Sequence, residues 1–597
     1  MIVRKTVMEI GYGTKKENAT MKRSILTNLR TLVALIVTGV ALSACSGDDE
    51  NIESPQPSQP VEPQVYTMTV NATKGDGTAN SRMTRALSLN GSTLNATWTA
   101  GDVVKVYNSS DTELGTLTAQ SSGVSTTLSG SLSPAPSVSE ELTLKYLSPN
   151  YSSQDGTLTG AATSIDRVCD YAEASVTVES VTGGNITTTG TAAFENKQAI
   201  VRFLLKNSDS EAISAKRLLV NADGNTCTVT PSPASSDVYV AIPAISSKAV
   251  TLQATVGDDT YIYERANATF SNGNYYSVSV KMAKVTDLSA TETANCYIVP
   301  SKGYYKFKAT VKGNGTADLA GISKNTDASS IASAGLVWAT FGTNSAPDAD
   351  ELIRDISYSD GYVYFSTAKT YMEGNALVAI RDASENILWS WHIWLHNYNG
   401  TYLIGANSVK MMDCDLGALS TNTGSELSYG MYYQWGRKDP FVGPSAGTTL
   451  SAAYGQTKTI NVGSVSVGTA IQNPTNYYIA VNASSRWTNG DHWCSDASNM
   501  TLWSDAGKTI FDPCPPGWRL PTLSEIEGMG SGYYSAGNGF PASGFIGTEG
   551  TYYNPGNGTI WATTTDGSCG KIKVMQGDQA TWSRSPDMGF NVRCVKE

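Results

Sequence analysis

Two histidines spaced four residues apart are the first side chains in this sequence that could bind a metal. His392 and His396 stand in LWSWHIWLHN, and on a helix this spacing would place both imidazoles on one face. The neighbouring apolar residues Trp389, Trp391 and Ile393, however, alternate as they do on a β-strand. Two residues four apart on a strand lie too far apart to hold one ion. We therefore predict a polar strand face beside an apolar core and no metal site.

Other residue patterns in the sequence give little support to catalysis. The H-E-x-x-H and Walker loop patterns are absent from the sequence. Two carboxylate pairs, Glu525 with Glu527 and Asp413 with Asp415, have spacings that are common on any solvated element. A glycosidase needs two carboxylates that face one sugar, and sequence spacing does not establish that arrangement. We therefore predict that the chain is not an enzyme.

Aromatic residues near the end of the chain are candidates for stacking on a sugar. From Trp389 onward the chain carries ten of its twelve tryptophans, which could form a core, a ligand surface or both. Exposed aromatic side chains on loops are commonly functional, although each one alone is more often part of a core. Within glycine- and asparagine-rich stretches, we predict a ligand-binding face that comprises Trp561, Trp582, Tyr533, Tyr534, Tyr552 and Tyr553.

The N-terminal region has the layout of a secretory signal. Met21-Lys22-Arg23 begins a basic segment, and the apolar run that follows, Leu32 to Leu42, is too short to span a membrane. The next residues, Ser43-Ala44-Cys45, resemble a bacterial lipobox, which implies that Cys45 becomes acylated. Residues 1–44 are therefore expected to be the signal region. Residues 45–64, which are acidic and proline-rich, are expected to tether the precursor to the cell surface at the outer membrane.

Charge and cysteine content restrict the partners and the compartment. The 597 residues carry a formal net charge of −11, and no basic cluster follows the signal region, so a nucleic-acid partner is excluded. Of the nine cysteines, eight remain after Cys45, and an exported protein can oxidise them. Eight cysteines allow 105 pairings, so the sequence alone does not fix the disulfides. Five of the eight lie beyond residue 400, where we expect cross-links.

Strand patterns dominate the rest of the chain and predict a mainly β protein. Residues 66–73, 103–107, 275–282 and 305–311 alternate with period two and are separated by turn-forming clusters. The best helix candidate covers 522–527, where the Thr and the Glu three residues later form a capping-box pattern. Composition shifts mark off a Thr-, Ser- and Val-rich region at 66–285, which is followed by two expected domains at 286–400 and 401–597.

The first part of the chain resembles the fimbrillins, the subunits of lipoprotein-derived pili. The stretch SRMTRALSLNGSTLNATWTAGDVVKVY at 81–107 and the strand NYYSVSVKM carry the resemblance. It implies two β-sandwich domains, expected at 65–190 and 191–285, and cleavage by an arginine-specific protease after Arg85 or Arg82. Cleavage would remove the strand at 66–73, and a strand from the next subunit would fill the groove by β-augmentation.

The last part resembles the major paralogous (FISUMP) family, whose fold is similar to C-type lectins and formylglycine-generating enzymes. The motifs MMDCDLGA, MYYQWGRKDPF, DPCPPGWRLPT and GFNVRCVK occur in that order. The resemblance implies an α+β lectin-like domain at 401–597, preceded by an Ig-like β-sandwich at 286–400. It also implies that the proline-rich loop 511–522 is a scaffold, with Cys514 paired to Cys594 or to Cys494.

The lectin-like resemblance raises two questions of chemistry. A reactive cysteine needs a neighbour that favours its thiolate, and neither Cys569 nor Cys594 has one in the sequence. Calcium is compatible with the oxygen donors Asp496, Asp505 and Asp512, but their spacing is generic, and we predict no metal and no cofactor.

Together these patterns favour a pilus tip subunit that acts as an adhesin. It would bind other pilus subunits by donor-strand exchange and present its C-terminal domain to a glycan or protein receptor, because a closed final domain cannot readily donate a strand. Two alternatives stay open. One is a standalone surface lipoprotein that binds glycans for nutrient capture, and the other is an ordinary shaft subunit.

Overall fold

The computed structural model describes residues 64–74, 87–90, 93–405, 408–446, 449–479, 492–496, 499–529, 539–553, 556, 558–575 and 580–597. Strands dominate these residues, which confirms the prediction of a mainly β protein. The described α-helices are short: α1 Ile165–Val168, α2 Val467–Gln472 and α3 Leu523–Glu527. None of the helices in the described ranges has the length and apolar character needed to cross a membrane.

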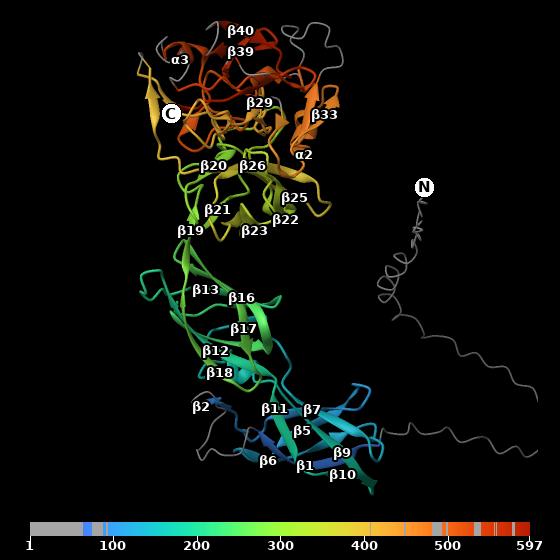
Figure 1. Ribbon diagram of the computed structural model, residues 1–597. Coiled ribbons are helices and arrows are strands. Elements are labelled where there is room, and N and C mark those ends of the chain that lie inside the picture. Colours follow the sequence, from blue (N-terminus) through green and yellow to red (C-terminus); the bar gives the residue numbers. More distant parts are fainter. Residues whose placement is uncertain are drawn as a thin grey trace, which may run out of the picture. The chain divides into compact units, whose positions relative to one another are not determined.

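The first sheet is closed into a barrel, which we call the first barrel (Figure 1, blue to teal). Its strands are β1 Tyr66–Lys74, β4 Val103–Tyr107, β5 Glu113–Ala119, β6 Ser125–Leu132, β7 Glu141–Tyr146, β9 Ala172–Thr182, β10 Asn185–Thr189 and β11 Ala192–Asn196. Strand β1 closes the barrel because it pairs antiparallel with β6 and parallel with β10 and β11. A small hairpin of β2 Ser88–Asn90 and β3 Thr93–Asn95 precedes β4.

The second module is a sandwich of two sheets with one apolar core. One sheet holds β12 Gln198–Lys206, β15 Asp237–Pro243 and β18 Tyr275–Lys281. The other holds β8 Ser153–Gln154, β13 Arg217–Ala222, β14 Asn225–Val229, β16 Ile245–Val256 and β17 Asp259–Phe270. Val201 and Leu252, from opposite sheets, are both fully buried in this core. The order of these strands along the chain does not follow the order of the modules. Strand β8 lies in the second module, but the chain then returns to the first barrel, which includes β11 at 192–196.

The third module continues the larger of these sheets. Strand β19 Ala283–Asp287 pairs with β17 at its start and with β21 Tyr304–Lys308 at its end. Beside β21 lie β24 Tyr362–Thr367 and β23 Ile353–Ser359. The opposing sheet comprises β20 Cys296–Val299, β26 Ile387–Leu395, β25 Gly374–Arg381 and β22 Ser333–Thr340, and a 3₁₀ turn lies at Ala328–Ser330.

The C-terminal module shares its main core with the third module. One sheet holds β27 Tyr402–Ile404, β28 Lys410–Met412, β42 Val595–Lys596 and β35 Trp518–Arg519. A larger sheet holds β29 Tyr432–Gln434, β36 Phe545–Ile546, β37 Tyr552–Tyr553, β38 Thr559–Asp566, β39 Cys569–Val574, β40 Thr581–Arg584 and β41 Gly589–Asn591. Smaller elements are β30 Pro444–Ala446, β31 Thr449–Leu450, β32 Tyr454–Gly455, β33 Thr459–Val462, β34 Asn476–Ile479 and 3₁₀ turns at Glu426–Ser428 and Asn499–Thr501.

Candidate functional site

Strand β1 completes the first barrel. It alone fills the slot between β6 on one side and β10 and β11 on the other. Its side chains alternate strictly, so that Met68, Val70 and Ala72 are buried in the core while Thr67 and Thr69 are exposed. It pairs with β6 over eight residues and with β10 and β11 on its other side. Without β1, the barrel would expose an apolar groove between two unpaired strand edges.

A buried ion pair closes one end of this slot. The Lys74 Nζ lies 2.7 Å from Oδ2 of Asp170, and both side chains are almost fully buried. The same ammonium group lies 3.5 Å from the ring centroid of Tyr146 and 5.1 Å from that of Trp98. The Gln198 Nε2 donates to the other Asp170 oxygen at 3.4 Å. The alternation of β1, extended by one residue beyond 73, would give the signal for this site, because it puts Lys74 on the buried face.

The motif W-x-x-G-D forms the turn that enters β4. The Asp102 carboxylate accepts a hydrogen bond of 2.8 Å from the backbone N–H of Thr99, and Gly101 has a φ of +93°. This φ favours glycine, because it lies in the left-handed region. Trp98 is buried in the barrel core, edge-on to Phe194.

The predicted processing sites lie outside the described residues. Arg82 and Arg85 belong to the segment between Lys74 and Leu87, and the predicted lipidation site Cys45 also lies outside the described ranges. Leu87 is buried in a small apolar cluster that it forms with Ile165 and other residues. The chain is therefore anchored again two residues after Arg85.

The proline-rich loop at 511–522 is a scaffold for the end of the chain, as the sequence predicts. A disulfide joins Cys514 to Cys594, which resolves the choice of partner, because the buried Cys494 instead lies beside the backbone N–H of Asp496. Asp512 accepts hydrogen bonds from the N–H groups of Cys514 and Leu520 at 2.8 and 2.9 Å. Burial raises the pKa of Asp512 to about 6.

The helix after this loop begins as predicted. Thr522 is the N-cap of α3, and a full capping box joins it to Glu525. Arg519 forms an ion pair with the same Glu525 at 2.5 Å. The side chains of Trp518 and Leu520 are buried, and β35 pairs with β42. The loop therefore fixes the last strand and leaves no aromatic face for a ligand.

Strand β26 is confirmed at the predicted position, but its histidine-bearing face is not a polar surface. His392 is 1% exposed, and its Nε2 hydrogen-bonds to Asn375 Oδ1 at 2.8 Å. Gly417 closes over it, and a Cβ at Gly417 would lie 3.3 Å from the His392 ring. Burial lowers the pKa of His392 to about 3. His396 hydrogen-bonds to Glu373 instead, so the two imidazoles have different partners.

A second buried cluster covers the same face of β26. The Lys438 ammonium donates to Ser390 Oγ at 2.6 Å and lies 2.5 Å from the Asp439 carboxylate. Burial lowers the pKa of Lys438 to about 8, although the charge of Asp439 opposes that shift. Nearby in the module, Arg593 pairs with Asp415 in a buried ion pair of 2.6 Å. Neither pair could be predicted from the sequence, because nothing local to KDP or VRC shows that these residues are covered.

The predicted aromatic ligand-binding face is wrong for Trp561 and Tyr552, which are both buried. Trp561 is fully buried, and its Nε1 donates to the Tyr433 carbonyl at 2.8 Å. Tyr552 is 5% exposed, and Tyr553 is half-buried and stacks on Phe545. These side chains form a core because strands distant in the chain cover the glycine-rich segments that carry them. Tyr533 and Tyr534 lie outside the described residues.

Trp582 alone among the described members of that set is exposed. It is 43% accessible on β40, the last strand of the larger sheet, and it packs beside Arg584. On the same sheet, Asp566 accepts hydrogen bonds from Ser583 and Lys571 at 2.7 and 2.8 Å. Because side chains alternate along a strand, Trp582 shares its face of β40 with Arg584, whereas Ser583 and Lys571 lie on the opposite face. Trp582 therefore presents its indole without this hydrogen-bonding cluster beside it.

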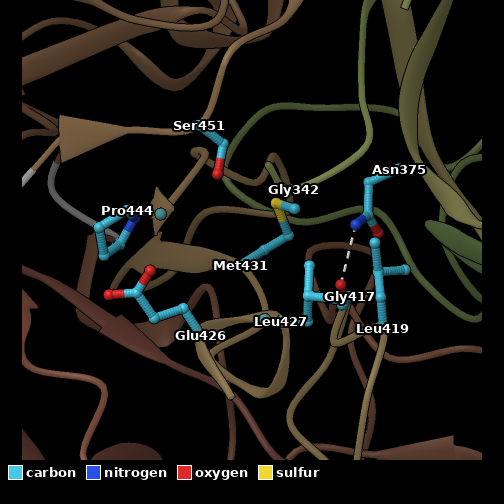
Figure 2. A pocket seen from close by; sticks show the side chains of 11 residues that line it. Gly342, Asn375, Gly417, Leu419, Glu426, Leu427, Met431, Pro444 and Ser451 are labelled. Atoms are coloured by element: carbon cyan, nitrogen blue, oxygen red, sulfur yellow. Dashed lines mark hydrogen bonds between the residues drawn. The ribbon is translucent and has the colours of Figure 1, made fainter. Parts of the chain in front are cut away.

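A small pocket between the third and C-terminal modules does not fit a sugar (Figure 2). Gly342 and Asn375 line it from the third module, and Glu426, Met431 and Ser451 from the C-terminal module. Its volume is about 20 Å³, which is room for about one water molecule. It is a packing gap beside the Asn375 side chain.

Residues 443–447, GPSAG, match the G-x-S-x-G pattern of serine hydrolases, but the described part of this segment has no catalytic context. Ser445 lies in the short strand β30, where its Oγ donates to Asn344. In a serine hydrolase the serine of this motif stands on a strand-to-helix turn beside a histidine. Here Ser445 stands within β30, which pairs antiparallel with β31.

The three aspartates compatible with calcium serve separate backbone segments. Asp496 accepts from the Val467 N–H at 2.7 Å, Asp505 accepts from the Thr564 hydroxyl at 3.0 Å, and Asp512 caps the proline-rich loop. Within the described ranges, no three acidic, histidine or cysteine side chains gather in a way that could hold a metal ion.

Comparisons with known proteins find distant structural likeness only. No family model matches the chain, and no curated protein matches it. A fimbrial assembly protein from Parabacteroides distasonis is 13% identical, over 36% of this chain and 90% of its own, with a TM-score of 0.22. The tip fimbrial protein Mfa3 from Porphyromonas gingivalis is 8% identical, over 36% and 95%, with a TM-score of 0.20.

The shaft pilin SpaA from Lactobacillus rhamnosus GG is 14% identical, over 37% of this chain and 98% of its own, with a TM-score of 0.17. TM-scores this low establish neither a shared fold nor a shared function. The interpretation of the site therefore rests on the chain's own residues.

Proposed function

We propose that this protein is a pilus subunit that accepts a strand from another subunit after cleavage between β1 and β2. The observation that carries the proposal is the position of β1, one strand with three core side chains between β6 and the β10–β11 pair. Arg82 and Arg85 stand in the segment that ties it to the rest of the chain. Cleavage there would make β1 exchangeable, because only hydrogen bonds, packing and one ion pair would hold it.

We further propose that the subunit ends the filament and presents its C-terminal module as an adhesin. Strand β42 is paired on both sides and lies next to the disulfide-bonded Cys594, so it cannot be given to a neighbour without opening the module. The side of the molecule available to a glycan or protein receptor includes the exposed Trp582. The protein would reach the surface as a precursor acylated on Cys45.

A standalone glycan-binding lipoprotein is the second candidate. It is favoured by the completeness of the uncut first barrel, in which β1 is already paired on both sides. Such a protein would keep β1 and its lipid, and would need no donor strand.

Immunogold electron microscopy with antibodies against residues 401–597 tests the tip position. We expect gold at filament ends in cells that express the unaltered chain. An Arg82→Ala/Arg85→Ala chain is the matched control, and it should leave gold on the outer membrane and none on filaments. Gold spread over the membrane for both chains would overturn the pilus function and favour the standalone lipoprotein.

A further inference from the structure

We propose that the groove left by β1 selects a donor strand that carries a basic residue at the position of Lys74. This inference rests on the proposed strand exchange and adds the chemistry of the partner to it. The selecting group is Asp170, a carboxylate at one end of the slot. The partner is therefore a subunit whose donor strand combines alternating apolar residues with one lysine or arginine.

The selection follows from what burial does to an unpaired charge. Asp170 is 4% exposed while β1 is in place, with the Lys74 ammonium on one oxygen and the Gln198 amide on the other. A donor strand that restores the core also removes this carboxylate from water. If the donor carries an apolar residue there, the carboxylate is buried without its cation, which is strongly unfavourable. The groove thus disfavours donor strands that lack a basic residue at this position, and it binds those that carry one.

Two aromatic rings make the same end of the slot fit a cation. The ammonium of Lys74 lies 3.5 Å from the Tyr146 ring centroid and 5.1 Å from that of Trp98. The faces of tyrosine and tryptophan attract ammonium and guanidinium groups. Both rings belong to the barrel that remains after cleavage, so the binding site for the cation stays behind when Lys74 leaves.

The inward-facing residues of β1 also fix where the basic residue must stand. Met68, Val70 and Ala72 occupy successive inward positions, and Lys74 follows two residues after the last of them. For a strand that runs in the direction of β1, the pattern is apolar-x-apolar-x-small-x-basic. A one-residue shift would turn the basic side chain to the outside and bury the outward residues.

Synthetic peptides that copy residues 64–76 test the selection on the full chain after cleavage with an arginine-specific protease. Fluorescently labelled peptides with Lys74, Lys74→Arg and Lys74→Met are compared for entry into the cut protein. We expect the lysine and arginine peptides to bind with similar affinity and the methionine peptide to bind about 100-fold more weakly. A Thr67→Met peptide, which adds the same side chain to the exposed face, should bind within about threefold of the original.

An Asp170→Asn chain is the reciprocal test. In that chain the methionine peptide should bind at least as well as the lysine peptide, because the lysine ammonium would then be the charge that is buried without its partner. Equal binding of the lysine and methionine peptides to the unaltered chain would overturn the selection but leave strand exchange intact. If no peptide enters a cut chain that circular dichroism shows to be folded, strand exchange itself fails, and the selection fails with it.

Discussion

The first barrel and the C-terminal module close their sheets in opposite ways. The barrel is completed by β1, a strand held through hydrogen bonds, three apolar side chains and the Lys74–Asp170 pair. The C-terminal module is completed by β42, which follows a cysteine cross-linked across 80 positions to the proline-rich loop. Under the proposed strand exchange, a single backbone cut would free β1, whereas a comparable cut before β42 would leave that strand tied to the loop by the disulfide.

The two regions also differ in the size of the side chains that fill them. Trp98 is the sole tryptophan of the barrel core. The core shared by the third and C-terminal modules contains Trp338, Trp389, Trp391, Trp394, Trp435, Trp493, Trp503, Trp518 and Trp561. Large aromatic side chains bury the most apolar area per residue.

The largest expected effect is the loss of the cross-link. Cys514→Ser/Cys594→Ser should lower the free energy of unfolding of the C-terminal module by about 4 kcal/mol, because the unfolded loop gains freedom. Urea denaturation followed by tryptophan fluorescence measures it, since most tryptophans lie in this part. Hydrogen exchange of β1 amides should stay unchanged. An unchanged urea midpoint would show that the disulfide contributes nothing to the free energy of unfolding of this module.

Trp561→Ala should have a comparable effect on the same core. The fully buried indole leaves a cavity and an unpaired Tyr433 carbonyl, at a cost of about 4 kcal/mol. Trp582→Ala is the matched control, since its exposed side chain should change the stability by no more than about 0.5 kcal/mol. Similar losses in both variants would contradict the assignment of one tryptophan to the core and the other to the surface.

Acid should destabilise the third and C-terminal modules through their buried imidazoles. The folded pKa of His392 is about 3, below the ordinary value, so the unfolded chain takes up a proton that the folded chain does not. Stability is therefore lost as the pH falls from about 6.5 towards 3, and at pH 4 the loss is on the order of 3 kcal/mol. His492, whose pKa burial also lowers to about 3, acts in the same direction.

The comparison that isolates this effect is His392→Gln against the unaltered chain. Urea midpoints between pH 7 and pH 4 should fall less steeply in the variant. Carboxylates titrate in both chains and cancel in the difference. If the urea midpoints of the two chains fell equally between pH 7 and pH 4, His392 would be protonated in the folded protein.

The smallest of these effects belongs to the cap of α3. Thr522→Ala removes one half of the capping box and should cost about 1 kcal/mol. Thr522→Ser keeps the hydroxyl and should recover most of the loss. Both are measured as urea midpoints of the C-terminal module, and an equal loss in the serine variant would show that the hydroxyl is not the stabilising group.

Local sequence patterns predicted several strands and the helix α3 correctly, but they did not predict which faces of these elements are buried. Period-two alternation found β1, β4, β18 and β21, and the Thr–Glu spacing found the capping box of α3. These features depend on neighbours in the sequence, so the sequence shows them. Lys74 was not predicted to face inward, because the predicted alternating stretch ends at residue 73 and a lysine gives no sign of burial until its partner Asp170 is known.

The sequence did not show which side chains are buried by segments that lie far away in the chain. Trp561 lies in a strand beside glycine-rich segments, yet its indole is capped by a carbonyl 128 positions earlier. His392 alternates as a strand residue, but residues around Gly417 bury the face it occupies. Strand periodicity tells which residues share a face, and only the tertiary arrangement tells whether that face meets water.

The most direct test of an exchangeable β1 is the N-terminal residue of the protein recovered from the cell surface. Mass spectrometry of surface filaments should find chains that begin at Ala86 or Met83, after Arg85 or Arg82, and therefore lack a covalently attached β1. Surface protein that begins only at an acylated Cys45 would contradict the account, because β1 would then remain a permanent part of the barrel.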